Sequence, residues 1–112
     1  EVVGDVLTDL GYEVKFALNG QEAIRYYAEA SGSGRPFDAV ILDLTIPGGT
    51  GGKECCERLI KMDPDVKAIV SSGYSDDPVM ANFRMYGFKA AIPKPYRIPK
   101  LCAVISEVLK SD

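Results

Sequence analysis

The spacing of apolar residues along the chain changes between the period of a helix and the period of a strand. Residues 2–10 carry apolar side chains at the spacing of one helix face, and Gly11 is placed to end that helix. Residues 12–17 alternate between polar and apolar, which predicts a half-exposed strand. A second amphipathic segment, 21–30, predicts another helix, and the Gly/Ser-rich loop 31–36 follows it.

The rest of the chain repeats a unit in which a buried strand is followed by a helix. Residues 39–42 are continuously apolar, as a parallel strand covered on both faces is, and Asp43 interrupts the run. The later elements are predicted as a helix over 53–62, a strand over 66–70, a helix from Ser75 to Gly87, a strand over 88–92 and a helix over 98–109. This order predicts one α/β domain over residues 1–112, with helices on both faces of a parallel sheet.

Composition adds limits to this picture. A chain of 112 residues with 46% hydrophobic and 26% charged residues is typical of one soluble domain. The apolar runs are much shorter than a membrane span, and the first residues lack the basic and apolar regions of a signal peptide. A net charge of −3 without a basic run argues against direct contact with nucleic acid. These features indicate a cytoplasmic domain with no membrane contact.

The cysteine and histidine content excludes several kinds of site. Cys55, Cys56 and Cys102 have neither a disulfide framework nor a zinc spacing, and we expect them to be reduced and mostly packed. The sequence has no histidine, which excludes a Ser-His or Cys-His catalytic pair and a histidine phospho-donor within this chain.

Asp43 is the first candidate for chemistry. It stands where a buried strand ends, and a loop rich in glycine follows it. Ligands and reactive groups of open α/β sheets gather at the carboxyl ends of the strands, where a carboxylate serves as a nucleophile or a metal ligand. Many strand-end aspartates instead cap the following loop, and for Asp43 alone the two interpretations carry equal weight.

Polar side chains also follow the next two buried strands. Ser71 and Ser72 end one of them, and Lys94 follows the other. Neighbouring parallel strands would bring these groups to the same edge as Asp43, where a carboxylate, a hydroxyl and an ammonium can hold a phosphoryl group. Taken singly, Lys94 fits a solvated loop lysine and Ser72 fits a helix-start residue, so only the three together favour a site.

Three ordered segments resemble the receiver domain of two-component response regulators, most closely the receivers of hybrid sensor histidine kinases. The segments are Leu42–Gly51, Ser71–Ser75 and Lys94–Tyr96, and the resemblance covers nearly the whole chain. It implies the receiver fold, a flavodoxin-like doubly wound parallel sheet with strand order 2-1-3-4-5.

The resemblance implies a role for each matched position. Asp43 would accept a phosphoryl group from a partner's phosphohistidine, Ser72 would be the switch hydroxyl, and Lys94 would contact the phosphoryl oxygens. Asp43 and the backbone carbonyl of Thr45 would contribute to a Mg²⁺ site. The residues that shape the loops would be Pro47, Gly51 and Pro95.

The sequence departs from the family pattern at two places. The aromatic switch residue that the family carries three positions before the lysine is Ala91 here. The family's first strand, with an acidic pair of Mg²⁺ ligands at its end, has no counterpart before the helix over 2–10. Without these ligands, we expect this polypeptide to accept phosphate poorly or not at all.

An absent first strand would leave two facing strand edges about 9.6 Å apart, roughly two strand spacings. Such edges invite pairing with another chain, as a homodimer or through an exchanged strand. Three explanations are open: a longer form of the protein carries the strand, a swapped neighbour supplies it, or the domain is a degenerate receiver. We favour the first because Asp43, Ser72 and Lys94 all keep their places.

The resulting interpretation is a phosphorylation switch and not a turnover enzyme. Its partner would be a sensor histidine kinase or a phosphotransfer domain, and phosphorylation of Asp43 would change its conformation. A phosphorylation-independent pseudo-receiver that binds other proteins is the alternative, favoured by Ala91 and by the absent acidic pair. An aspartate-nucleophile phosphatase is more distant, because Thr45 stands where the acid–base aspartate of that signature would be.

Overall fold

The computed structural model describes residues 2–17, 20–44, 52–73, 78–94 and 96–110. Its helices are α1 (Val2–Asp9), α2 (Gly20–Gly32), α3 (Gly52–Met62), α4 (Pro78–Ala81), the 3₁₀ helix η1 (Phe83–Tyr86) and α5 (Ile98–Lys110). Its strands are β1 (Val40–Asp43), β2 (Ala68–Ser72) and β3 (Ala90–Pro93). No helix in this described part of the chain is long and apolar enough to cross a membrane.

The described strands form one parallel sheet in the order β1-β2-β3. The register pairs Asp43 with Ser71, and it pairs Ser72 with Pro93. The last residues of the three strands therefore meet at one side of the sheet, which we call the carboxyl edge. The α/β fold with a parallel sheet that the sequence predicts is confirmed.

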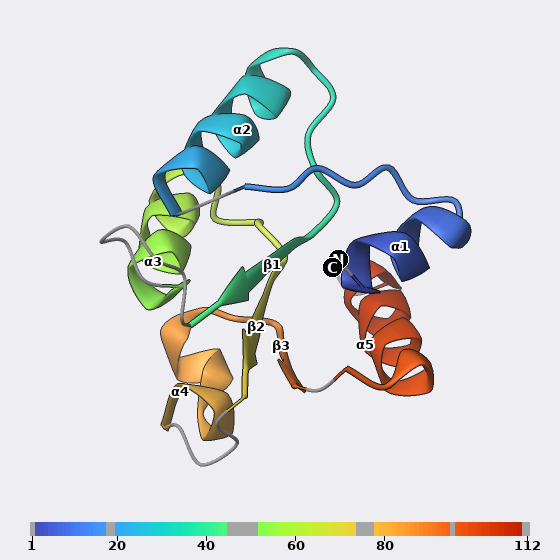
Figure 1. Ribbon diagram of the computed structural model, residues 1–112. Helices are drawn as coiled ribbons and strands as arrows, with labels where there is room; N and C mark the ends of the chain where they lie inside the picture. The colour runs from blue at the N-terminus through green and yellow to red at the C-terminus, as the bar shows by residue number, and fades with distance from the viewer. Residues whose placement is uncertain (1, 18–19, 45–51, 74–77, 95, 111–112) are drawn as a thin grey trace.

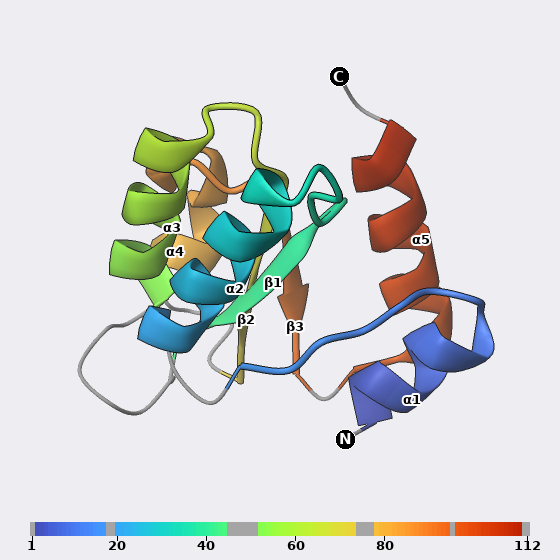
Figure 2. The ribbon, with the colours of Figure 1, turned by 90° about the horizontal axis from the view of Figure 1, so that it is seen from above.

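Helices cover both faces of this sheet (Figures 1 and 2). Figure 2 shows α2 and α3 on one side of the strands and α1 and α5 on the other. Side chains alternate accordingly: Leu42 and Val70 belong to the core beside α2 and α3, whereas Ile69 and Ile92 belong to the core beside α5. Because both faces are covered, these strands are continuously apolar in the sequence.

Polar contacts fix the end of α3. The Tyr27 hydroxyl, on α2, donates a hydrogen bond of 2.7 Å to Oδ2 of Asp63. The other carboxylate oxygen, Oδ1, accepts the N–H of Asp65 at 3.0 Å. Burial and the neighbouring Asp63 carboxylate raise the pKa of Tyr27. These contacts, with Pro64 between them, explain why the helix stops where the sequence predicts.

The prediction of a strand over residues 12–17 is wrong. This segment is extended but belongs to no strand (Figure 1). Its first residue is held by a backbone hydrogen bond of 3.0 Å from the Tyr12 N–H to the Leu7 carbonyl, which leads back to α1. A strand needs a neighbouring backbone within hydrogen-bonding distance, and here a cavity separates the segment from β1.

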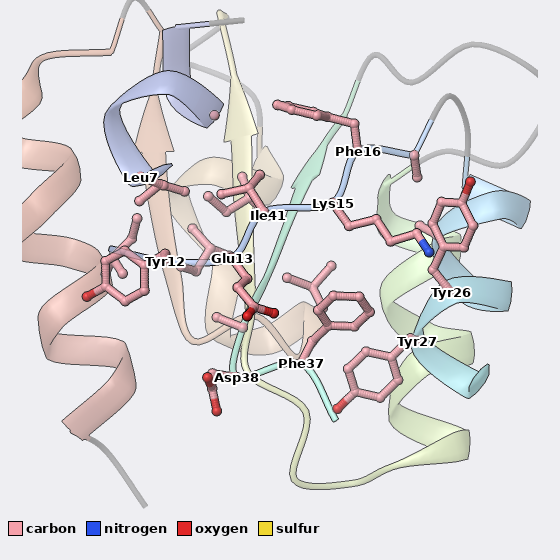
Figure 3. A pocket seen from close by; sticks show the side chains of 18 of the residues that line it. Leu7, Tyr12, Glu13, Lys15, Phe16, Tyr26, Tyr27, Phe37, Asp38 and Ile41 are labelled. Carbon is pink, nitrogen blue, oxygen red and sulfur yellow. The ribbon is translucent and has the colours of Figure 1, made fainter. Parts of the chain in front are cut away.

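This cavity has a volume of about 810 Å³. It is bordered by α1, by residues 12–17, by the chain from Arg35 to Asp43, and by Tyr96. Figure 3 shows Phe16, Phe37 and Ile41 among the side chains around it. The sequence predicts two strand edges that face each other. In the structure, the edge of β1 faces residues 12–17 across the cavity, and this segment is not a strand.

The helix predicted from Ser75 to Gly87 is divided into α4 and η1, and its predicted start lies outside the described residues. Asn82, between the two, has φ −122° and ψ 39°. Its side-chain Nδ2 donates to the Pro78 carbonyl at 3.2 Å, as its own backbone N–H also does at 2.9 Å. An asparagine side chain that competes for helix carbonyls accounts for this break.

Gly87 ends η1 in a left-handed conformation, with φ 94° and ψ 1°. A Cβ at this position would lie 2.2 Å from Cδ1 of Ile60. We therefore expect Gly87→Ala to lower the free energy of unfolding by about 1–2 kcal/mol through the backbone conformation alone. The displacement of Ile60 should add to this loss. Urea unfolding measures the change.

The matched control for this substitution is Gly34→Ala. Gly34 also has a positive φ, 82°, but a Cβ added there would meet nothing within 4 Å. The two variants therefore share the backbone cost and differ in the contact with Ile60. A loss at Gly87 no larger than the loss at Gly34 would contradict the close packing of this turn on α3.

Two thiols are buried in α3. The side chains of Cys55 and Cys56 are 0% exposed and donate weak hydrogen bonds to the Gly20 and Tyr86 carbonyls. Burial, the largest cause in both, raises the pKa of each thiol to about 11. Because the folded pKa lies above the unfolded one, neutral thiols stabilise the fold fully below pH 9.0, and this contribution is lost as the pH rises towards 11.

These pKa values predict selective thiol chemistry. At pH 8, a thiol reagent should modify the partly exposed Cys102 faster than the two buried cysteines, because burial limits both the access to Cys55 and Cys56 and their ionisation. Mass mapping of the labelled peptides measures the order, and labelling in urea should make all three equivalent. The urea concentration at the midpoint of unfolding should also decrease as the pH is raised from 9 to 11. Equal labelling of the three thiols in the native protein would show that α3 is not packed as described.

Candidate functional site

Asp43 is the last residue of β1 and lies at the carboxyl edge. The preceding residues, Ile41 and Leu42, pack into the two cores on opposite faces of the sheet, so the strand fixes the point at which Asp43 emerges. The Asp43 side chain is 29% exposed. A reactive group on another molecule can therefore reach its carboxylate.

Lys94 contacts this carboxylate directly. Its Nζ donates a hydrogen bond to Oδ2 of Asp43, and the two side chains form an ion pair. Lys94 follows β3, and β2 lies between β3 and β1, so the contact spans the whole carboxyl edge. The structure thus brings together two residues that the sequence predicts for one site. The Lys94 side chain is 36% exposed, and a partly solvated pair of this kind contributes little to stability.

Two buried serines end the middle strand, between Asp43 and Lys94. Ser71 is 0% exposed and Ser72 is 1% exposed. Ser71 is level with Asp43 in the register, and by the alternation of β2 it faces the side of α5, whereas Ser72 faces the side of α3. The Ser72 carbonyl accepts the backbone N–H of Lys94 at 2.9 Å. Ser72 therefore lies at the predicted edge, one residue beyond the level of Asp43.

A contact between Ser71 and Tyr96 is a feature that sequence reasoning missed. The Ser71 Oγ and the Tyr96 hydroxyl oxygen are 2.6 Å apart, and either group can be the donor. A signal for it exists in the sequence: a hydroxyl inside a buried strand needs a hydrogen-bond partner, and a tyrosine follows Lys94 by two positions.

Other predicted site residues are not placed by the structure. Those outside the described residues are Thr45, Pro47, Gly51 and Pro95, and their roles stay predictions. Ala91, which stands at the aromatic switch position, lies in β3 and packs against the core beside α2 and α3. A methyl side chain there can only fill space, so no ring can rotate at this position.

The described residues do not by themselves assemble a Mg²⁺ site. Among them there is no group of three or more His, Cys, Asp or Glu side chains that could hold a metal ion. Mg²⁺ needs six oxygen ligands in near-octahedral geometry, and Asp43 provides a carboxylate that is already paired with Lys94. The described donor set does not, on its own, fit a magnesium ion.

The carboxyl edge combines groups suited to phosphoryl chemistry. A partly exposed carboxylate can act as a nucleophile and form an acyl phosphate. An ammonium beside it can neutralise phosphoryl oxygens through charge-assisted hydrogen bonds. The hydroxyls at the end of β2 lie on the same edge. Such chemistry needs no histidine or cysteine, because a carboxylate can itself form the covalent bond to phosphorus.

The parallel sheet, the helices on both faces and the polar carboxyl edge together define a doubly wound α/β protein with its site at the strand ends. Within this class, the chain belongs to the response regulator receiver domain family, which it matches over residues 1–106. The resemblance found in the sequence is thereby confirmed. Receiver domains are signalling modules of two-component systems and phosphorelays, pair with histidine kinases or phosphotransferases, and typically bind Mg²⁺.

Individual relatives support this assignment. The chain is 32% identical to the chemotaxis protein CheY of Thermotoga maritima over 107 residues, which cover 95% of this chain and 84% of CheY. It is 31% identical over 106 residues to the sensor kinase CckA of Brucella abortus, and the match covers 95% of this chain. The chain spans 11% of the length of CckA and 40% of the length of a response regulator receiver protein of Anaeromyxobacter.

The solved structures agree on the fold. The receiver domain of NtrX from Brucella abortus superimposes with a TM-score of 0.83, covering 99% of this chain and 89% of that domain. The sequence identity in this comparison is 22%, so it shows that the two chains share the receiver fold and nothing more.

Proposed function

We propose that residues 1–112 form one phosphoacceptor receiver domain of a two-component phosphorelay, with Asp43 as the acceptor. The observation that carries this proposal is the contact between the Asp43 carboxylate and the Lys94 ammonium at the carboxyl edge. An aspartate that only capped a loop would need no lysine from beyond the middle strand. We place the domain in the cytoplasm, where its three free cysteines would stay reduced.

The proposed reaction transfers a phosphoryl group from a histidine of the partner. A carboxylate oxygen of Asp43 attacks the phosphorus of the phosphohistidine, the new O–P bond forms, and the N–P bond breaks. The electron pair of the broken bond stays on the imidazole, which takes up a proton. The products are an acyl phosphate on Asp43 and a free histidine. The donor must belong to another protein or domain, because this chain has no histidine.

Lys94 and Ser72 have supporting roles in this proposal. Lys94 transfers its hydrogen bond from the carboxylate to an oxygen of the incoming phosphoryl group and offsets the added negative charge. Ser72 donates its hydroxyl to another phosphoryl oxygen. The backbone bond from Lys94 to the Ser72 carbonyl holds the two residues together at this edge. These groups assist the phosphorylation of Asp43 and the hydrolysis of the resulting acyl phosphate, but the domain turns over no separate substrate.

The proposed output is a change in shape on one side of the domain. Ser72 precedes the segment that leads to α4, and Lys94 precedes the segment that leads to α5. Movement of both residues towards a new charge would therefore shift α4, β3 and α5 together. A partner that recognises this surface would distinguish the two states.

Intact mass spectrometry tests the proposal. A form of the protein that includes the family's first strand and its acidic pair is incubated with acetyl phosphate in a magnesium-containing buffer, and its mass is compared with that of an untreated sample. Residues 1–112 alone, without these Mg²⁺ ligands, are expected to react poorly or not at all. The proposal expects one phosphoryl adduct, which decays over time and is absent when acetate replaces acetyl phosphate. A protein that stays unmodified while binding a partner equally well with and without acetyl phosphate would instead be a phosphorylation-independent interaction domain.

A further inference from the structure

Tyr96 follows the site lysine by two positions and is anchored inside the fold. Its hydroxyl oxygen lies 2.6 Å from Oγ of Ser71, which is 0% exposed. Its ring packs against the core beside α5, which also contains Ile69 and Ile92. Tyr96 is therefore a fixed point of the chain directly beyond Lys94.

The chain around Lys94 is attached to the middle strand, β2, at two points. The N–H of Lys94 donates to the Ser72 carbonyl at 2.9 Å, and Tyr96 is bound to the Ser71 side chain. These two anchors are consecutive residues of β2. The chain that carries Lys94 is thus fastened at two points to one short piece of rigid, buried strand.

The same piece of strand also positions Asp43. Ser71 is the register partner of Asp43, and its carbonyl accepts the Leu44 N–H at 3.0 Å. A closed path therefore runs from Asp43 through Ser71 to Tyr96, along the chain to Lys94, and back to Asp43 through the ion pair. A change in the Ser71–Tyr96 contact must alter how Lys94 is presented to Asp43.

We propose that Tyr96, through its hydroxyl bond to Ser71, is the positioning residue that holds the Lys94 ammonium against Asp43. This inference rests on the proposed phosphoacceptor role of Asp43. A lysine side chain is long and has many rotamers, so the base of the side chain must be fixed if its ammonium is to stay at one carboxylate. Packing of the Tyr96 ring restricts the position of the chain next to Lys94, and the hydrogen bond of the hydroxyl also fixes its orientation.

The substitution that isolates the hydroxyl is Tyr96→Phe, which keeps the ring. We expect it to slow the phosphorylation of Asp43 by acetyl phosphate about tenfold, the effect of one hydrogen bond. Ser71→Ala should slow the reaction by the same factor. Tyr12→Phe removes a hydroxyl from a tyrosine that is 38% exposed, and it should leave the rate unchanged.

A double-mutant cycle separates positioning from a general loss of structure. If Tyr96 acts through Lys94, Tyr96→Phe should have no further effect in a Lys94→Ala background. A tenfold loss in both backgrounds, or a wild-type rate for Tyr96→Phe, would overturn the proposal. A variant that merely unfolded more easily would slow the reaction in either background.

A second readout does not depend on phosphorylation. The side-chain ¹⁵N signal of Lys94 reports its contact with Asp43 in the unphosphorylated protein. Tyr96→Phe should move this signal towards that of Asp43→Asn, and Tyr12→Phe should not. If the wild-type protein formed no adduct, the phosphoacceptor role would fail, yet this signal would still decide the positioning role. An unmoved Lys94 signal in Tyr96→Phe would overturn it.

Discussion

An Asp43→Asn variant is expected to form no phosphoryl adduct with acetyl phosphate, under conditions in which the wild-type protein is modified. The amide has nearly the shape of the carboxylate, so the fold and the carboxyl edge should be preserved. It is not a nucleophile at neutral pH and cannot form an acyl phosphate. The loss should therefore be complete, as measured by intact mass over the full time course.

The matched control is Asp38→Asn. Asp38 is an exposed residue of the same type that precedes β1, so it lies at the opposite end of the strand that carries Asp43. The Asp38→Asn variant should be phosphorylated on Asp43 at the wild-type rate. Loss of the adduct in both variants would point to a general effect of charge, and persistence of the adduct in Asp43→Asn would place the acceptor elsewhere.

A Lys94→Ala variant is expected to accept phosphate about a hundredfold more slowly than the wild-type protein, as when one donor to a developing charge is removed. The nucleophile is intact in this variant, so the reaction should be slow and not absent. Without the ammonium, the carboxylate and the phosphoryl oxygens repel each other with less compensation. The initial rate of adduct formation measures the effect.

Lys89→Ala controls for the loss of a lysine that flanks the same strand, β3. Lys89 precedes β3, and its N–H pairs with the Ala68 carbonyl at the far end of the sheet from the carboxyl edge. Its removal should leave the rate within about twofold of the wild type, since surface charges at this distance are screened. Equal slowing by the two variants would show that Lys94 contributes only to the overall charge.

The parts of the fold that could be predicted from sequence are those with strong local signals. Continuous apolar runs marked the strands that became β1, β2 and β3, because strands buried on both faces carry no polar alternation. Turn residues marked most helix ends: Gly11 and Gly87 both adopt positive φ, and Asp63 caps the end of α3. Boundaries shifted by two residues at the start of β2 and β3, where pairing and not apolarity sets the strand.

The failures come from interactions that local sequence does not record. Residues 12–17 have the alternation of a strand, but a strand also depends on a neighbour, and the cavity keeps β1 out of reach. Asn82 divides a helix that its neighbours would have continued, because its side chain takes the Pro78 carbonyl. Both outcomes depend on the surroundings and not on the propensity of the segment.

The candidate site also has a part that could be predicted from sequence and a part that depends on its surroundings. The order of strands places the ends of β1, β2 and β3 side by side, so the approach of Lys94 to Asp43 could be predicted from three separate motifs. That a buried serine at the end of β2 needs a hydrogen-bond partner could also be predicted. The choice of Ser71 as the partner of Tyr96 could not, because it depends on which of two adjacent serines faces α5. One residue of difference in register would have exchanged their positions.

The most direct test of the central claim is to find where the phosphoryl group is attached. An acyl phosphate on an aspartate is reduced by borohydride to homoserine, which peptide mass mapping identifies at a single position. We expect homoserine at position 43 after treatment with acetyl phosphate, and an unchanged aspartate there in the untreated protein. A phosphoryl group that resists borohydride, or homoserine at any other aspartate, would contradict it.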